Sequence, residues 1–198
     1  QATSLDVTLK MRLGWDDSSL NAPLIAKRAE SAGVRMVAVH GRTRCQFYKG
    51  AADWQAIGRV KRAVSIPVIA NGDIVDVTSA RQALQQSGAD GVMVGRGAQG
   101  APWRLAEISS ALYGTPAPKI PKGAALAHLI LQHHQDIVDF YGGTLGLKNA
   151  RKHLGWYLDG LQVAPELRQS LLRSFDLSEI HELIWRAVEA PSTAGVAA

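Results

Sequence analysis

The sequence has little cysteine and no long apolar run. Cys45 is its single cysteine, which excludes internal disulfides and any cysteine-rich metal site. No stretch reaches the roughly 18 uncharged apolar residues that a membrane-spanning helix needs. Residues 1–6 also lack the basic and apolar segments of a signal peptide. We therefore expect a cytoplasmic protein without a membrane segment or a bound metal.

Acidic residues are fewer than basic ones, and the excess of basic residues is local. The 198 residues include 22 Lys and Arg against 17 Asp and Glu, a net charge of +5. Residues 1–118 hold 14 of the basic and 9 of the acidic residues, whereas residues 119–198 hold 8 of each. The second part is therefore no basic arm. An RNA contact there would need a local cluster, and Lys148, Arg151, Lys152 and His153 form the one dense cluster.

The first half of the sequence alternates β-branched runs with segments of helical apolar spacing. We expect strands at residues 7–11, 36–40, 67–71 and 91–95. Helices are expected at 20–31, ending near Gly33, after the N-caps Asp53 and Asp76, and after Pro102. This pattern of four β/α units predicts an α/β fold with a parallel sheet and right-handed crossovers.

A barrel is favoured over an open doubly wound sheet. No GxGxxG motif follows the first predicted strand, and polar candidates stand at the carboxyl ends of all four strands, where barrel active sites are built. A complete (β/α)₈ barrel takes roughly 250 residues, and only four units are present. The prediction is the C-terminal half of a TIM barrel.

Proline and composition divide the rest of the chain. Residues 114–122 contain three prolines, which oppose regular structure and indicate a linker. Helical spacing follows at 124–141, 145–158, 165–175 and 178–188. We expect a half-barrel at 1–113, the linker at 114–122, an all-α helical bundle at 123–190 and a disordered tail at 191–198.

Several polar residues at predicted strand ends are candidates for a binding site. Lys10 shares one strand face with Thr8 and Arg12, and needs an anionic partner such as a flavin or phosphate, or a neighbouring carboxylate. His40, Arg42 and Arg44 stand together after the second strand, where the histidine could equally be a structural hydrogen-bonding group.

Glycines and a cation follow the third and fourth strands. Such loops let backbone N–H groups approach a phosphate, although each could also be only a tight turn. The residues concerned are Asn71, Gly72, Asp73, Gly95 and Arg96.

One segment of the helical half combines cations with aromatic rings. Arg151 and Lys152 lie near Trp156 and Tyr157 at helical spacing, which suits contacts to RNA backbone and bases. The alternative is that the rings pack in a core while the cations face water. The pattern leaves both interpretations open.

Five motifs together resemble the bacterial tRNA-dihydrouridine synthases, most nearly those of the B type. The motifs are VTLKMRLGWD at 7–16, HGRTR at 40–44, IPVIANGDI at 66–74, GVMVGRGA at 91–98 and RKHLGWY at 151–157. The resemblance implies an enzyme that uses NADPH to reduce FMN and then reduces uridine in tRNA to 5,6-dihydrouridine. It further implies that Lys10, His40, Asn71, Gly72, Asp73, Gly95 and Arg96 bind FMN, and that Arg42, Arg44, Lys148, Arg151 and Lys152 contact uracil or tRNA.

The resemblance also indicates what this chain does not carry. In the family a catalytic cysteine, which acts as the acid, precedes the segment matched by Lys10. Cys45 takes a variable position without a clear neighbouring base, so no catalytic residue is assigned, although His40 could support the reaction. The chain alone is expected to be inactive or very slow.

Two other functions fit parts of the pattern. The chain could be an RNA-binding or regulatory module without catalysis, or part of another FMN barrel oxidoreductase that acts on a small molecule. In any of these readings a half-barrel exposes sheet edges and apolar surface, which predicts self-association.

Overall fold

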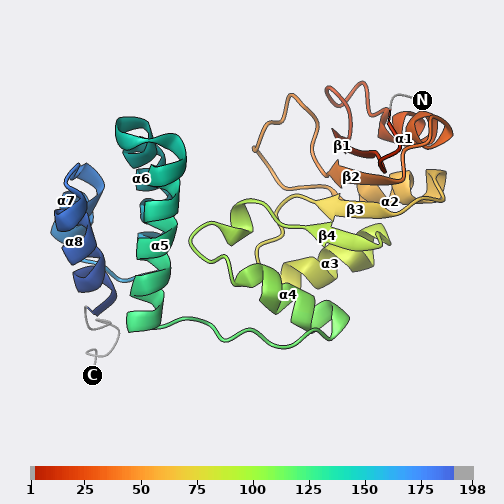
Figure 1. Ribbon diagram of the computed structural model, residues 1–198. Helices are drawn as coiled ribbons and strands as arrows, with labels where there is room; N and C mark the ends of the chain where they lie inside the picture. Colours follow the sequence, from red (N-terminus) through yellow and green to blue (C-terminus); the bar gives the residue numbers. More distant parts are fainter. Residues whose placement is uncertain (1–2, 190–198) are drawn as a thin grey trace. The chain divides into compact units, whose positions relative to one another are not determined.

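The computed structural model describes residues 3–189, which form two compact units (Figure 1). Within that range the first unit takes the residues up to Ala98 together with Arg104–Ala117. The second takes Gln99–Trp103 and the residues from Pro118 onward. The predicted tail at 191–198 lies outside the described residues.

The first unit is built on a four-stranded parallel sheet, which confirms the predicted α/β fold. Strands β1 (Thr8–Arg12), β2 (Met36–His40), β3 (Val68–Asn71) and β4 (Gly91–Met93) lie side by side in chain order (Figure 1). Each neighbouring pair is parallel. Strand β4 ends two residues earlier than expected, because the chain turns into a short 3₁₀ helix at Arg96–Ala98, where the Ala98 N–H bonds to the Gly95 carbonyl at 3.0 Å.

Helices α1 (Ala22–Ser31), α2 (Trp54–Ala63), α3 (Val77–Ser87) and α4 (Arg104–Tyr113) follow the four strands in turn. The two predicted N-caps are confirmed. Asp53 accepts a bond from the Ala56 N–H, and Asp76 forms a reciprocal capping box with Ser79. Such caps satisfy backbone donors that the first helical turn leaves free, and each stabilises by about 1 kcal/mol.

Alternation along the strands gives the sheet two faces, one of which packs against the helices. Val37 and Val39 of β2, with Val68 and Ala70 of β3, are buried in the same core as Ile57 and Val60 of α2 and the alanines of α1 and α3. Burial of each such valine contributes roughly 1.5–3 kcal/mol. The residues that alternate with them, Ala38 and His40 on β2 and Ile69 and Asn71 on β3, therefore lie on the opposite face. That face carries the candidate site.

The second unit is helical throughout its described residues. Its helices are α5 (Ala124–Tyr141), α6 (Gly143–Asp159), α7 (Pro165–Arg173) and α8 (Leu177–Glu189), and no strand occurs among them. Their shared core contains Ile130, Leu154, Tyr157, Ile180 and Ile184. Residues 114–122 ahead of α5 contain no helix or strand.

A glycine allows the helices of the α5–α6 hairpin to pack closely. A Cβ atom at Gly146 would lie 2.7 Å from the Val138 Cα and 3.0 Å from its carbonyl oxygen. Neither backbone atom can move without displacing α5. Gly146 therefore determines how closely these two helices approach.

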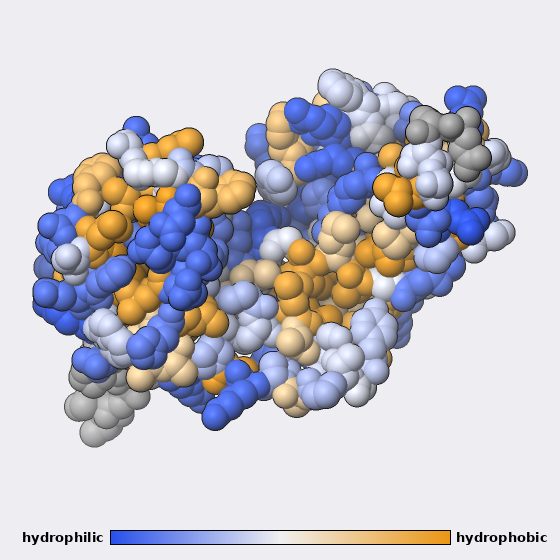
Figure 2. Space-filling model, in the orientation of Figure 1, coloured by the Kyte–Doolittle hydropathy of each residue, from blue (hydrophilic) through white to orange (hydrophobic). Residues whose placement is uncertain are grey.

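Figure 2 shows apolar residues at the surface of both units among hydrophilic ones. Large apolar side chains left exposed include Val7, Met93 and Leu105 in the first unit and Phe140 and Leu145 in the second. In the described range 3–189, no helix combines the length and apolarity needed to cross a membrane. Nor does that range contain a group of three or more metal-ligating side chains arranged around one point.

Candidate anion-binding site

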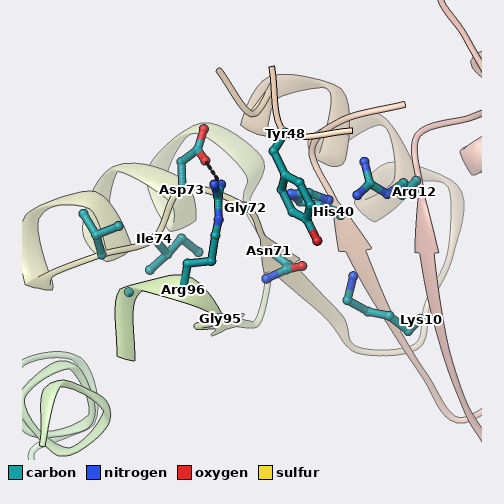
Figure 3. A pocket seen from close by; sticks show the side chains of 12 residues that line it. Lys10, Arg12, His40, Tyr48, Asn71, Gly72, Asp73, Ile74, Gly95 and Arg96 are labelled. Atoms are coloured by element: carbon teal, nitrogen blue, oxygen red, sulfur yellow. Dashed lines mark hydrogen bonds and ion pairs between the residues drawn. The ribbon is translucent and has the colours of Figure 1, made fainter. Parts of the chain in front are cut away.

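A pocket of about 610 Å³ opens at the carboxyl ends of the strands (Figure 3). Its lining comes from all four strands or the loops that follow them. The residues are Lys10, Arg12, His40, Tyr48, Asn71, Gly72, Asp73, Ile74, Val75, Gly95, Arg96 and Gly97. All seven residues expected to bind a cofactor are therefore brought together in one cavity.

Strand register explains why three of these side chains meet. Arg12 is the register partner of His40, and His40 is in turn the register partner of Asn71. Parallel neighbours in register present the same face, so these side chains form a row across the ends of three strands. Lys10 lies two residues before Arg12 on the same face of β1, which adds a second cation to the pocket.

The loop after β3 has a backbone that only glycine accepts. Gly72 has φ +112°, and a Cβ there would lie 2.6 Å from the His40 ring and 2.8 Å from the Ala52 Cβ. The Trp54 indole N–H holds the Gly72 carbonyl at 2.9 Å from the outer side. Asp73 follows with φ 54°, an unusual conformation for a residue with a side chain. This loop is fixed from several directions.

Asp73 joins three loops through its carboxylate. Arg42 donates to both oxygens at 2.9 and 2.7 Å, the Ala52 N–H donates at 2.8 Å, and Arg96 donates at 3.3 Å. Figure 3 shows the Arg96 contact as a dashed line. The aspartate therefore holds Arg96 at the pocket, and its negative charge is matched by the guanidinium of Arg42 behind it.

The expectation that Arg42 contacts uracil or tRNA is wrong for this structure. Its side chain is 2% exposed, and besides Asp73 it donates to the carbonyls of Lys49 and Gly50 at 3.1 and 2.5 Å. Arg42 thus donates four hydrogen bonds to groups within the protein. A sequence shows only that Arg42 stands in a loop, and it does not show that the loop folds over it.

Three cations give the pocket a positive lining. The basic side chains are Lys10, Arg12 and Arg96, and the pKa of Lys10 is lowered by desolvation first and by Arg12 second. Burial, followed by the charges of Arg12 and Lys10, lowers the pKa of His40 to about 4. His40 is therefore a neutral imidazole at pH 7, able both to donate and to accept a hydrogen bond.

The carboxyl group of Asp73 remains ionised. Desolvation, its largest single influence, acts to raise the pKa, but the hydrogen bonds from Arg42 and Ala52 and the adjacent charges outweigh it. The pKa of Asp73 is consequently below its usual value. Since Arg42 neutralises this charge, the field inside the pocket is set by Lys10, Arg12 and Arg96.

The glycines after β4 differ in what they permit. A Cβ at Gly97 would clash with the Ile74 carbonyl oxygen and lie 2.7 Å from the Val75 Cα, so the two loops touch there through backbone. Gly95 has no neighbour within 4 Å of such a Cβ. Close packing of the two loops therefore requires glycine at Gly97, which is not one of the residues expected in the site. Gly95 lies beside open space.

Two other pocket residues are absent from the expected site. Arg12 lies on the same face as Lys10 and bonds to the carbonyls of Thr43 and Phe47 at 2.8 Å each. Tyr48 stands over the pocket, with the Arg96 guanidinium 4.6 Å and the Arg12 guanidinium 5.6 Å from its ring centre. Alternation along β1 was a signal for Arg12. Tyr48 comes from a loop whose path no periodicity reveals.

The remaining candidates are not among the pocket-lining residues. Arg44 is exposed, with its guanidinium 4.4 Å from the centre of the Phe47 ring. In α6, Lys148 and Lys152 are exposed one turn apart, whereas Arg151 is half-buried over Phe175 at 4.6 Å. Tyr157 belongs to the core of the helical unit and its hydroxyl bonds to His133 at 3.0 Å.

The chain matches the family model described as dihydrouridine synthase over residues 1–190, and it belongs to that family. A "Probable tRNA-dihydrouridine synthase" of Rhodobacter capsulatus is 60% identical over 175 residues, covering 88% of this chain and 53% of that protein. One of Rickettsia conorii is 52% identical over 168 residues, covering 85% and 51%. The "tRNA-dihydrouridine synthase B" of Pseudomonas syringae pv. tomato is 46% identical over 168 residues, covering 84% and 50%.

The chain spans about half the length of these relatives. Among solved structures, a crystal structure of a mandelate oxidase variant with 2-hydroxy-phenylacetamide is 20% identical, with a TM-score of 0.38, covering 89% of this chain and 55% of that one. Similarity at this level defines neither the fold nor the reaction.

Proposed function

We propose that this chain is the part of a tRNA-dihydrouridine synthase that holds the phosphate of FMN and contacts tRNA. The observation that carries the proposal is the pocket lined by Lys10, Arg12 and Arg96, with one carboxylate that Arg42 neutralises. The family match and the names of the relatives support the same activity.

The residues present fit a phosphate-bearing cofactor. A volume of about 610 Å³ lies within the range of small-molecule sites, roughly 300–1,000 Å³. The pocket has three basic side chains and fewer carboxylates. Its charge therefore favours an anionic ligand. Gly95 leaves open space next to Arg96, where a phosphate could approach the backbone. Asn71, Gly72, Gly95 and Arg96 would hold the phosphate, and Asp73 would act by positioning Arg96.

Sequential strand order supports the larger architecture. Strands β1 to β4 are neighbours in chain order, whereas a doubly wound sheet reverses direction at its switch point. With the pocket at the carboxyl ends, this order fits the winding of a TIM barrel, and we propose that residues 1–113 form its C-terminal half. Residues 114–122 would be the linker, and residues from 123 to 190 a helical tRNA-binding domain.

When bound, FMN would supply the hydride-transfer chemistry between NADPH and the uracil ring of a tRNA nucleotide. Lys10 would supply positive charge that offsets the anionic cofactor. His40 would offer a neutral imidazole for hydrogen bonding, because its low pKa keeps it unprotonated. Such a tRNA-modifying enzyme would act in the cytoplasm.

No proton donor equivalent to the family's cysteine is among the pocket residues of this chain. Cys45 is exposed and is not part of the pocket lining. This chain alone should therefore reduce uridine in tRNA very slowly, and ordinary turnover with NADPH and FMN would contradict that expectation.

Titration of the chain with FMN, followed by flavin fluorescence, tests the proposal. Saturable binding is expected, and Arg96→Ala should weaken it at least about tenfold, because a charged hydrogen-bond partner is lost. Arg59→Ala is the matched control, since it removes an exposed arginine from helix α2. The absence of saturable binding, or equal loss in both variants, would contradict the proposal.

A further inference from the structure

Two consecutive aromatic rings are exposed in the loop between β2 and α2. Phe47 is 54% and Tyr48 is 60% exposed. Large apolar side chains usually leave water on folding, so two adjacent exposed rings are unusual.

Guanidinium groups gather on these two rings. Arg44 lies over Phe47 at 4.4 Å, and Tyr48 has Arg96 at 4.6 Å and Arg12 at 5.6 Å. The described residues contain one further cation–π contact, in the other unit. We call Phe47, Tyr48, Arg12, Arg44 and Arg96 the aromatic rim of the pocket. It combines planar rings with positive charge.

The backbone at Phe47 is held in an unfavourable conformation. Its φ is 51°, in the left-handed region that residues with a Cβ rarely adopt. The carbonyl of Phe47 accepts from Arg12 at 2.8 Å, and its N–H donates to the Arg44 carbonyl at 3.3 Å. Such strain destabilises the fold and concentrates at functional sites. Here the strained backbone fixes an exposed ring. Burial of the ring therefore does not compensate for the strain.

Acidic groups near the rim are already engaged. Asp73 is paired with Arg42, and Asp16 accepts hydrogen bonds from Ser18 and Ser19 within its own turn. The serine hydroxyls leave the charge of Asp16 in place. The four arginines at the rim and behind it, Arg12, Arg42, Arg44 and Arg96, outnumber the two carboxylates, so the net charge is positive. An apolar protein surface would bury these guanidiniums without partners, whereas a nucleic acid offers phosphates to them and base faces to the rings.

We infer that the aromatic rim is a stacking site for unpaired nucleotides of an RNA, next to the nucleotide that reaches the pocket. The inference rests on the proposed function and extends it to named contacts. Tyr48 lines the pocket, and Phe47 precedes it in the chain without being among the lining residues. Bases would stack on the rings, and Arg44 would pair with phosphate.

The test measures binding of the 198-residue chain to a fluorescently labelled 12-nucleotide single-stranded RNA and to the corresponding duplex. Phe47→Asn removes the ring while keeping a residue that tolerates the left-handed conformation, so the fold should remain intact. Phe47→Tyr retains a ring. Tyr113→Ala is the matched control, since Tyr113 is 55% exposed and lies beside Gly91, at the opposite end of the strands.

Single-stranded RNA should bind more tightly than the duplex, and Phe47→Asn should weaken it roughly tenfold, as expected for a lost stacking contact. Phe47→Tyr and Tyr113→Ala should leave the affinity within about twofold. Circular dichroism and FMN titration of each variant show whether the fold and pocket are retained.

Equal affinity of wild type and Phe47→Asn would overturn the inference while leaving the proposed function standing. Failure of the wild type to bind RNA at low salt would overturn it as well. The FMN titration on the same samples then decides the cofactor-binding proposal separately.

Discussion

Arg42 and Asp73 form a two-pronged ion pair between the loops that follow β2 and β3. The bonds are 2.9 and 2.7 Å long, and the arginine side chain is 2% exposed against 31% for the aspartate. One end of the pair is in the protein interior, and the other supports Arg96 at the pocket. The pair therefore links the stability of the unit to the charge of its pocket.

Arg42→Met should lower both stability and FMN affinity. Breaking a fully buried pair costs about 3–5 kcal/mol, and the partial exposure of Asp73 reduces this to about 2–3 kcal/mol. The unpaired carboxylate should also repel phosphate. Urea unfolding and FMN titration measure the two effects. Lys61→Met breaks the exposed pair with Asp90, 2.7 Å long, and should cost no more than about 1 kcal/mol. Similar losses in the two variants would contradict this account.

Gly72→Ala should destabilise the first unit by about 3 kcal/mol and abolish FMN binding. The new Cβ would meet the His40 ring at 2.6 Å while the backbone stays at φ +112°. Gly33→Ala provides the comparison, because Gly33 has φ +94° but nothing within 4 Å of a Cβ. It should cost about 1 kcal/mol. If thermal unfolding shows equal losses, contact with His40 is not the cause.

The described residues also predict how stability depends on pH. His134 is 3% exposed, its Nδ1 lacks a hydrogen-bond partner, and burial followed by His181 and His133 lowers its pKa from 6.5 to about 4. The unfolded chain binds the proton more readily, so this stabilisation is present above pH 6.5 and is lost as pH falls toward 4.

Wild type should lose about 2 kcal/mol of unfolding free energy through His134 between pH 7.5 and pH 5. His40, whose pKa is also about 4, adds a loss of the same sign. His134→Leu should keep its stability at pH 7.5 and show a smaller loss on acidification. Urea denaturation at both pH values measures this difference. If His134→Leu loses as much unfolding free energy on acidification as the wild type, His134 is not the source of the pH dependence.

Cations of α6 should differ in their effect on tRNA binding. Lys148 and Lys152 are exposed and four residues apart, so they share one helix face. Changing either to Gln should weaken tRNA binding and reduce the slope of affinity against salt by roughly 0.7–0.9. Arg151→Gln should act mainly on stability, because Arg151 packs on Phe175 and has a buried Nη2 without a partner. Filter binding at several salt concentrations separates the two effects.

Local pattern in the sequence determined the elements of this protein. Alternating valines predicted β2 at its observed bounds, and the caps Asp53 and Asp76 predicted where α2 and α3 begin. These predictions succeeded because side-chain alternation and N-capping depend only on neighbours within a few residues. The same alternation placed Lys10 on the face that lines the pocket.

Only the tertiary structure decided which loop residues face the pocket. Arg42 and Arg44 are two residues apart in one motif, yet Arg42 is buried against Asp73 while Arg44 is exposed over Phe47. The difference depends on the path of the loop at 41–53 and on partners about thirty residues away. Tyr48 was missed for the same reason, because the strands fix their side-chain directions by periodicity and loops fix them by long-range contacts.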